Sequence, residues 1–298
     1  MSVKYCVWKV RRDGVSQRYR VAPSREHDSA VVGVVSGDLA TAESHKEQEL
    51  ARKLLQNPSV QELLYRSLVR QYEETGSSDS EPMLFLQHYL SRGHSEAEAL
   101  LVRLATEPSN GNIRVVAIET IATSMDSRAP RLIREIADKA PDELTVSDAI
   151  AELAAYLDNT MENLISEGIT PAREAILDAL ETLGLAMQGK WFEPTENEIT
   201  NILVALNYKR SEFEQAAHGQ IPDSIEKTLV DGLVSALSIE SLSAKAFAQT
   251  LDVIKEWGSE YALRKLRSYL RGNLPQWGRG IVIDAMNEIE HQLKRKSG

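Results

Sequence analysis

Hydrophobic positions recur at helical spacing through most of this chain, most clearly over residues 243–293. In that segment three sets of apolar side chains repeat three or four residues apart, and breaks containing glycine or proline separate the sets. Such a pattern predicts a helix, a tight turn, a second helix, a short loop and a third helix. A related pattern covers residues 113–136. We therefore expect most of the chain to form helical hairpins that stack on one another.

Two segments before residue 95 are also predicted to be helical. Residues 38–56 have the composition of a polar helix, and residues 58–74 place apolar side chains on one helical face. Glycine residues that follow apolar periods mark helix ends, and Gly168, Gly184 and Gly258 are expected to end helices.

The first part of the chain has a different period. Residues 4–22 carry strand-favouring side chains on both sides of Asp13-Gly14, a dipeptide that readily forms a tight turn. We expect a β-hairpin here, and residues 30–35 could add a third strand. Past residue 80 no alternating segment is long enough to predict a strand.

Composition then divides the chain into four parts. The segment GSSDSE at residues 76–81 has the low hydrophobicity of a flexible linker. The expected parts are a basic N-terminal β element (1–37), a helical segment (38–75), a linker (76–82) and a helical repeat domain (83–298).

Four segments share a pattern within the last part. Each begins with a small residue in a helix whose apolar positions recur three or four apart; they are residues 117–136, 149–165, 175–184 and 247–270. This pattern resembles the HEAT-like helical repeats over roughly residues 95–292. The resemblance implies a mainly α fold, an α-solenoid whose second helices line the concave side. With the β-hairpin expected from the strand pattern, the predicted fold is this solenoid with a small N-terminal β element. The alternative is an irregular all-α bundle.

Residues 185–245 fit the repeat worst. The segments 191–194 and 207–223 have the composition of an insertion or a long irregular connection. The number of repeats therefore stays open.

Composition limits the class of protein. The chain has 298 residues, of which 42% are hydrophobic and 26% are charged, and its one cysteine, Cys6, cannot form an internal disulfide. No apolar run reaches the roughly 20 residues that a membrane helix needs. The first residues lack the apolar core of a secretory signal. We expect a cytoplasmic protein without a membrane segment.

The charge is unevenly spread. The formal net charge is −10, yet the first 25 residues hold seven basic side chains and one acidic one. This asymmetry indicates a basic contact region on an acidic body.

Motifs for catalysis, metals and cofactors are not found. The six histidines lack metal-ligand spacing, and no glycine-rich phosphate loop or nucleophile motif occurs. The carboxylates are spread over the expected helix surfaces. We expect no metal site and no cofactor, we assign no catalytic residue, and nothing in the sequence argues for an enzyme.

Arginine spacing gives the candidate binding residues. Arginines repeat at helical intervals in the second helices of two hairpins, and others lie in the N-terminal hairpin. The candidates are Arg128, Arg131, Arg134, Arg264, Arg267, Arg271, Arg11, Arg12, Arg18 and Arg20. Residues that would add to the stripe of the later hairpin are Lys265, Tyr269, Trp277 and Arg279.

Guanidinium rows bind phosphate or carboxylate groups through paired hydrogen bonds. If the hairpins stack, Arg131 and Arg264 share one surface. The alternative is that these arginines are exposed to solvent and that nearby acidic side chains neutralise their charge.

The leading hypothesis is a non-enzymatic interaction or scaffold protein that binds a protein partner. One alternative is nucleic-acid binding through the arginine stripes and the hairpin. A second alternative is an enzyme with an unrecognised site.

Overall fold

A computed structural model describes residues 5–10, 16–21, 56–75, 81–169, 171–272 and 277–297. These residues are mainly α-helical, with thirteen helices and two strands among them. The chain divides into two compact units, Met1–Asp126 and Ser127–Gly298, and each is described by itself. The third strand expected at 30–35 and nearly all of the helix expected at 38–56 lie outside the described residues.

The first unit begins with two antiparallel strands, β1 (Tyr5–Val10) and β2 (Ser16–Val21). Tyr5 pairs with Val21 at one end and Val10 with Ser16 at the other. The turn residues Asp13 and Gly14, on which the expected hairpin depends, lie outside the described part.

Four helices follow in the first unit. They are α3 (Pro58–Thr75), α4 (Glu81–Ser91), α5 (Ser95–Thr106) and α6 (Gly111–Thr123). Helices α4, α5 and α6 pack against one another, and α3 packs against α5 and α6. Leu64, Leu68, Leu90 and Leu101 are almost completely buried in this unit. Helix α3 matches the amphipathic helix expected at 58–74.

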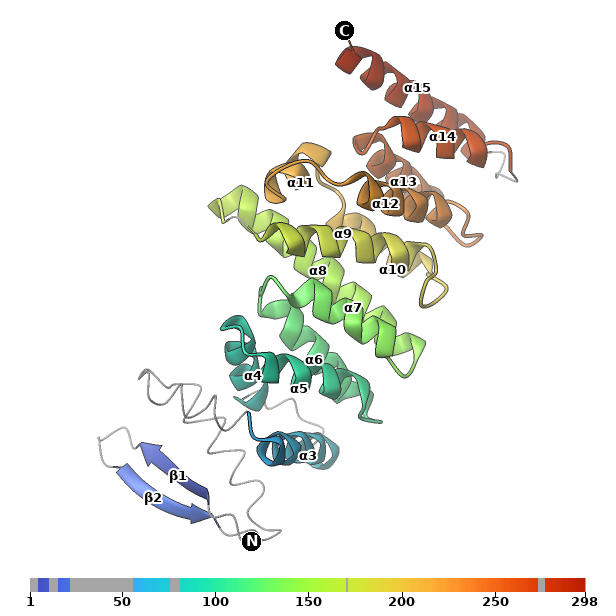
Figure 1. Ribbon diagram of the computed structural model, residues 1–298. Helices are drawn as coiled ribbons and strands as arrows, with labels where there is room; N and C mark the ends of the chain where they lie inside the picture. The colour runs from blue at the N-terminus through green and yellow to red at the C-terminus, as the bar shows by residue number, and fades with distance from the viewer. Residues whose placement is uncertain are drawn as a thin grey trace. The chain divides into compact units, whose positions relative to one another are not determined.

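The second unit contains nine helices among its described residues (Figure 1). They are α7 (Ala129–Lys139), α8 (Glu143–Glu167), α9 (Arg173–Met187), α10 (Glu196–Ala205), α11 (Arg210–Ala216), α12 (Asp223–Ala236), α13 (Ala244–Glu256), α14 (Glu260–Tyr269) and α15 (Gly278–Ser297).

These helices pack in two layers. Helices α7, α9, α12 and α14 contact one another in that order and form what we call the α7–α14 layer. Helices α8, α10, α13 and α15 do the same in the second layer. The layers alternate along the chain, as stacked hairpins require. The core lies between them and includes Leu153, Ile176, Leu233 and Ile254.

Two glycines allow α9 and α12 to pack closely. A Cβ atom added to Gly184 would lie 2.9 Å from the Cα atom of Leu229. A Cβ atom added to Gly232 would overlap the carbonyl oxygen of Gly184. Real Cβ atoms do not approach other atoms so closely, so both positions need glycine to keep this contact.

The role of Gly184 corrects a prediction. We expected Gly184 to end a helix, but it lies inside α9. Glycine is needed there because α12 packs too closely against α9 to leave room for a side chain. At Gly168 the prediction is confirmed, because this residue caps the end of α8 with a φ of 69°. Gly258 lies between α13 and α14, also as expected.

Short helix α11 occupies the region that fitted the repeat worst. Helices α10 and α12 continue the two layers, and α11 is inserted between them. Phe213 of α11 is fully buried, and its ring centre lies 5.6 Å from that of Trp257. The segment 207–223 is therefore an insertion that packs with the hairpins on either side.

Polar contacts also hold α11 in place. The Tyr208 hydroxyl donates a hydrogen bond of 2.7 Å to Asp158 of α8. Arg210 pairs with Glu226 of α12 at 2.9 Å. The guanidinium of Arg173 donates to the carbonyl oxygen of Gln220 at 3.0 Å, just after α11.

The domain boundaries expected from composition stay a prediction. Residues 76–80 of the expected linker lie outside the described part, and Glu81 and Pro82 belong to α4. The two compact units divide at Asp126 instead, a position that composition does not mark.

We predict that Gly232→Ala lowers the free energy of unfolding by about 1–3 kcal/mol, the usual cost of overpacking. The added methyl group must push α12 away from α9. Urea unfolding followed by tryptophan fluorescence measures the change.

Gly280→Ala is the matched control, because a Cβ atom there meets nothing within 4 Å. In helix α15 the alanine should leave stability unchanged or raise it by up to about 1 kcal/mol. If Gly232→Ala proves as stable as the unchanged chain, the close contact between α9 and α12 is wrong.

Candidate functional site

Three cationic side chains gather around Tyr261 on the exposed side of α12 and α14. The Nζ atoms of Lys227 and Lys265 lie 5.9 and 5.3 Å from the ring centre, and the Arg264 Cζ atom lies 5.7 Å from it. Tyr261, Arg264 and Lys265 share one face of α14 because they are three and four residues apart. Lys227 comes from the neighbouring helix α12. We call these four residues the Tyr261 cluster.

One carboxylate lies within the Tyr261 cluster. Asp231 of α12 is 2.7 Å from the Lys265 ammonium group, and the Tyr261 hydroxyl donates to its two oxygens at 2.8 and 2.9 Å. Lys227 and Arg264 form no ion pair with another residue in the described part of the chain. The cluster therefore has more positive than negative charge.

Asp231 also fixes the protonation of its partners. Burial, and then the hydrogen bond to Asp231, raise the pKa of the Tyr261 phenol. The same carboxylate raises the pKa of Lys265 through its hydrogen bond. At neutral pH the cluster therefore presents a neutral phenol and a full ammonium charge.

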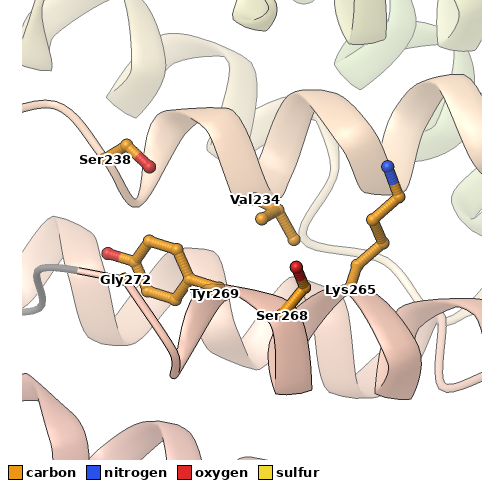
Figure 2. Close-up of a pocket in the computed structure, with 6 residues that line it drawn as sticks. All are labelled: Val234, Ser238, Lys265, Ser268, Tyr269 and Gly272. Carbon is orange, nitrogen blue, oxygen red and sulfur yellow. The ribbon is translucent and has the colours of Figure 1, made fainter.

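A groove of about 270 Å³ begins at Lys265 and runs between α12 and α14 (Figure 2). Val234 and Ser238 line it from the α12 side, and the α14 side supplies Lys265, Ser268, Tyr269 and Gly272. Figure 2 shows the Ser268 side chain directed from α14 toward α12, with the Tyr269 ring lying between the two segments. We call this feature the α12–α14 groove.

The far end of the groove differs from the Lys265 end. There the Tyr269 hydroxyl donates to the carbonyl oxygen of Leu237 at 2.5 Å, and burial raises the pKa of this phenol. Ser238 follows the last turn of α12, and Gly272 follows the last turn of α14. The C-terminal ends of helices carry partial negative charge on their carbonyl groups. The groove thus has a cationic end and an end rich in hydrogen-bond acceptors.

The arginines of α7 lie in the same layer but are balanced by acids. Arg134 pairs with Glu181 of α9 at 2.5 Å. Asp178 of α9 is also close to Arg134 and Arg131, and burial raises the pKa of its carboxyl group against their positive charge. Arg128 lies at the start of α7.

The expected common surface for Arg131 and Arg264 stays a prediction. Both residues are exposed and belong to the α7–α14 layer. However, α9 and α12 lie between their helices, so three helix spacings of 8–10 Å separate them by about 24–30 Å. Acidic side chains of α9 occupy part of that interval.

The three arginines of the later hairpin do different things. Arg264 belongs to the Tyr261 cluster, whereas Arg267 pairs with Glu290 of α15 at 2.6 Å. Arg271 is exposed just after α14, next to the groove residue Gly272, and forms no ion pair among the described residues. Only Arg264 and Arg271 are therefore available near the groove.

For the N-terminal arginines, the described residues show no contact with this site. Arg11 and Arg12 lie outside the described residues. In β2, Arg18 pairs with Trp8 of β1 and Arg20 with Cys6 in the strand register. Their role as binding residues stays a prediction.

Sequence spacing identified two of the six residues that line the groove, Lys265 and Tyr269, and also Arg264 of the Tyr261 cluster. It missed Lys227, Asp231 and Ser238. The first two belong to α12 and Ser238 follows it, so only the packing of α12 beside α14 reveals them.

The described residues hold no group of three or more His, Cys, Asp or Glu side chains arranged to bind a metal ion. Among the described helices, none combines the length and apolarity needed to cross a membrane. The cytoplasmic location stays a prediction.

Comparisons with known proteins give one structural likeness to report. No protein-family model matches the chain. No curated protein matches its sequence. Among solved structures, the chain is similar to human deoxyhypusine hydroxylase in complex with glycerol, with 13% identity, a TM-score of 0.25, and coverage of 89% of this chain and 98% of the other.

This comparison corrects the leading functional hypothesis. We expected a non-enzymatic scaffold, whereas the protein matched is named as a hydroxylase, which is an enzyme. We withdraw the scaffold hypothesis. At a TM-score of 0.25 the likeness assigns no reaction, cofactor or catalytic residue to this chain, so the site is argued from its own geometry.

We predict that Asp231→Asn lowers the pKa of Tyr261 toward that of a free phenol, because the negative charge that opposes ionisation is lost. The titration of carbon-labelled tyrosine, followed by NMR, measures this pKa. Asp252→Asn is the control, because Asp252 pairs with Lys255 on α13 and should leave Tyr261 unchanged. An unchanged Tyr261 titration in Asp231→Asn would show that the two groups do not interact.

Proposed function

We propose that this chain is a HEAT-like α-solenoid protein that binds a small organic anion in the α12–α14 groove. The two layers of alternating helices in the second unit support the solenoid assignment. The observation that carries the binding proposal is the Tyr261 cluster, in which three cations face one carboxylate beside a groove lined by hydroxyl groups.

The size of the groove supports a small ligand. Its volume of about 270 Å³ is slightly below the roughly 300–1,000 Å³ of typical small-molecule sites. A small molecule held by a few polar groups is also what a substrate site requires. The expected protein and nucleic-acid partners stay predictions that this groove does not address.

Charge favours a doubly charged group over a singly charged one. Lys265 already contacts Asp231, so an incoming anion competes with that carboxylate for the ammonium group. A phosphate monoester carries close to two negative charges at neutral pH. Arg264 can bind it with paired N–H groups while Lys265 donates one further hydrogen bond.

We predict that methyl phosphate shifts the backbone amide signals of Tyr261, Arg264 and Lys265, at the cationic end of the groove, in NMR titrations. Arg264→Gln combined with Lys265→Gln should weaken binding at least about tenfold, a loss of about 1.4 kcal/mol. Asp231→Asn should strengthen binding, because it removes the competing carboxylate. Both effects should shrink at high salt, which screens exposed charges.

Lys245→Gln combined with Arg295→Gln is the matched control. It removes the same total charge from exposed positions on α13 and α15, outside the groove. Binding should persist in this variant. If both double variants weaken binding equally, net charge and not the groove attracts the anion, and the proposal fails.

A further inference from the structure

We infer that the ligand of the α12–α14 groove is a phosphorylated polyol, of the sugar monophosphate class. This inference rests on the proposed function, since the phosphate group is placed at the cationic end. It goes beyond it by assigning the rest of the ligand from the groups that line the other end.

Four of the six residues that line the groove carry polar side chains, although apolar atoms make up more of its lining surface than polar atoms do. Hydroxyl groups of Ser238, Ser268 and Tyr269 line it, whereas Val234 is its one aliphatic side chain. Ser238 and Ser268 are both exposed, and the Ser238 hydroxyl hydrogen-bonds the Tyr269 phenol. The Ser268 hydroxyl can rotate to meet a ligand. A ligand with an alkyl or aromatic tail would give the Ser268 hydroxyl no partner, whereas a polyol can pair with it and with the oxygen atoms of Ser238 and Tyr269.

The spacing along α14 fits a short polyol. Tyr269 lies four residues after Lys265, which places it about 6 Å farther along the helix axis. Ser268 lies between them along that axis. A phosphate group at Lys265 therefore leaves room for a chain of a few hydroxyl-bearing carbons to reach Tyr269 and Ser238.

Hydrogen-bond direction then selects donors on the ligand. The Tyr269 proton already bonds to the carbonyl oxygen of Leu237, and the Ser238 hydroxyl donates to the phenol oxygen, whose second lone pair can accept a further bond from a ligand. The last turns of α12 and α14 add partial negative charge at this end. A second phosphate or a carboxylate has no proton to donate to these acceptors at neutral pH, whereas ligand hydroxyl groups donate to them.

A ligand ammonium group would also donate, but the charges nearby disfavour it. Arg271 is exposed next to Gly272 at this end, and it forms no ion pair among the described residues. No carboxylate lines the groove. A neutral hydroxyl group meets the acceptors without repulsion from the guanidinium.

Calorimetric titration of the full chain tests the inference with three probes. We expect ribose monophosphate to bind about tenfold more tightly than methyl phosphate, through its additional hydrogen bonds. We expect aminoethyl phosphate to bind no more tightly than methyl phosphate. Binding of aminoethyl phosphate as tight as that of ribose monophosphate would overturn the assignment.

Ser238→Ala combined with Ser268→Ala should remove most of the advantage of ribose monophosphate and leave the affinity for methyl phosphate unchanged. Ser235→Ala is the control, because Ser235 is exposed on α12 but does not line the groove. Thermal unfolding verifies that each variant is folded.

The two proposals fail in different ways. If all three probes bind equally, the groove binds the phosphate group alone, and the polyol inference is wrong while the proposed function stands. If no probe binds, the proposed function is wrong and the inference falls with it. If unphosphorylated ribose binds as well as ribose monophosphate, the placement of the phosphate at Lys265 is wrong.

Discussion

The second unit depends on the close approach of α9 and α12 at Gly184 and Gly232. A methyl group at either position would collide with the opposite backbone. This contact sets the spacing in the middle of the α7–α14 layer and thereby the position of α12. Helix α12 supplies Lys227, Asp231 and Val234, and Ser238 follows its last turn. The groove beside α14 therefore depends on a packing contact in which none of its own lining residues takes part.

The sequence pattern predicted those parts of the fold that depend on local periodicity. Helix α3 follows from the spacing of Val60, Leu64 and Leu68 on one face, and Gly168 ends α8 because glycine tolerates a positive φ. Gly184 misled the prediction because the same residue type also serves close helix packing. Periodicity alone cannot separate these two uses, since the second one depends on a helix more than forty residues away.

The candidate site was predictable to a similar extent. A regular spacing within α14 singled out Arg264 and Lys265, but the charges that decide their role lie on other helices. Arg267 is neutralised by Glu290 and Arg134 by Glu181, whereas Arg264 faces a tyrosine ring. The predicted continuous stripe therefore separates into paired arginines and one cationic cluster. What distinguishes them is tertiary pairing, which a single helical period does not contain.

Helix α11 has a consequence for how the second unit comes apart. In a simple repeat array each hairpin contacts only its neighbours, so hairpins at the ends can melt one at a time. Here one short insertion joins Asp158 of α8, Glu226 of α12 and the ring of Trp257 after α13. Three successive hairpins thus contact the same short helix. If α11 unfolded, all three hairpins would lose packing and polar contacts at the same time. The centre of this unit should therefore open as one cooperative block rather than by stepwise fraying.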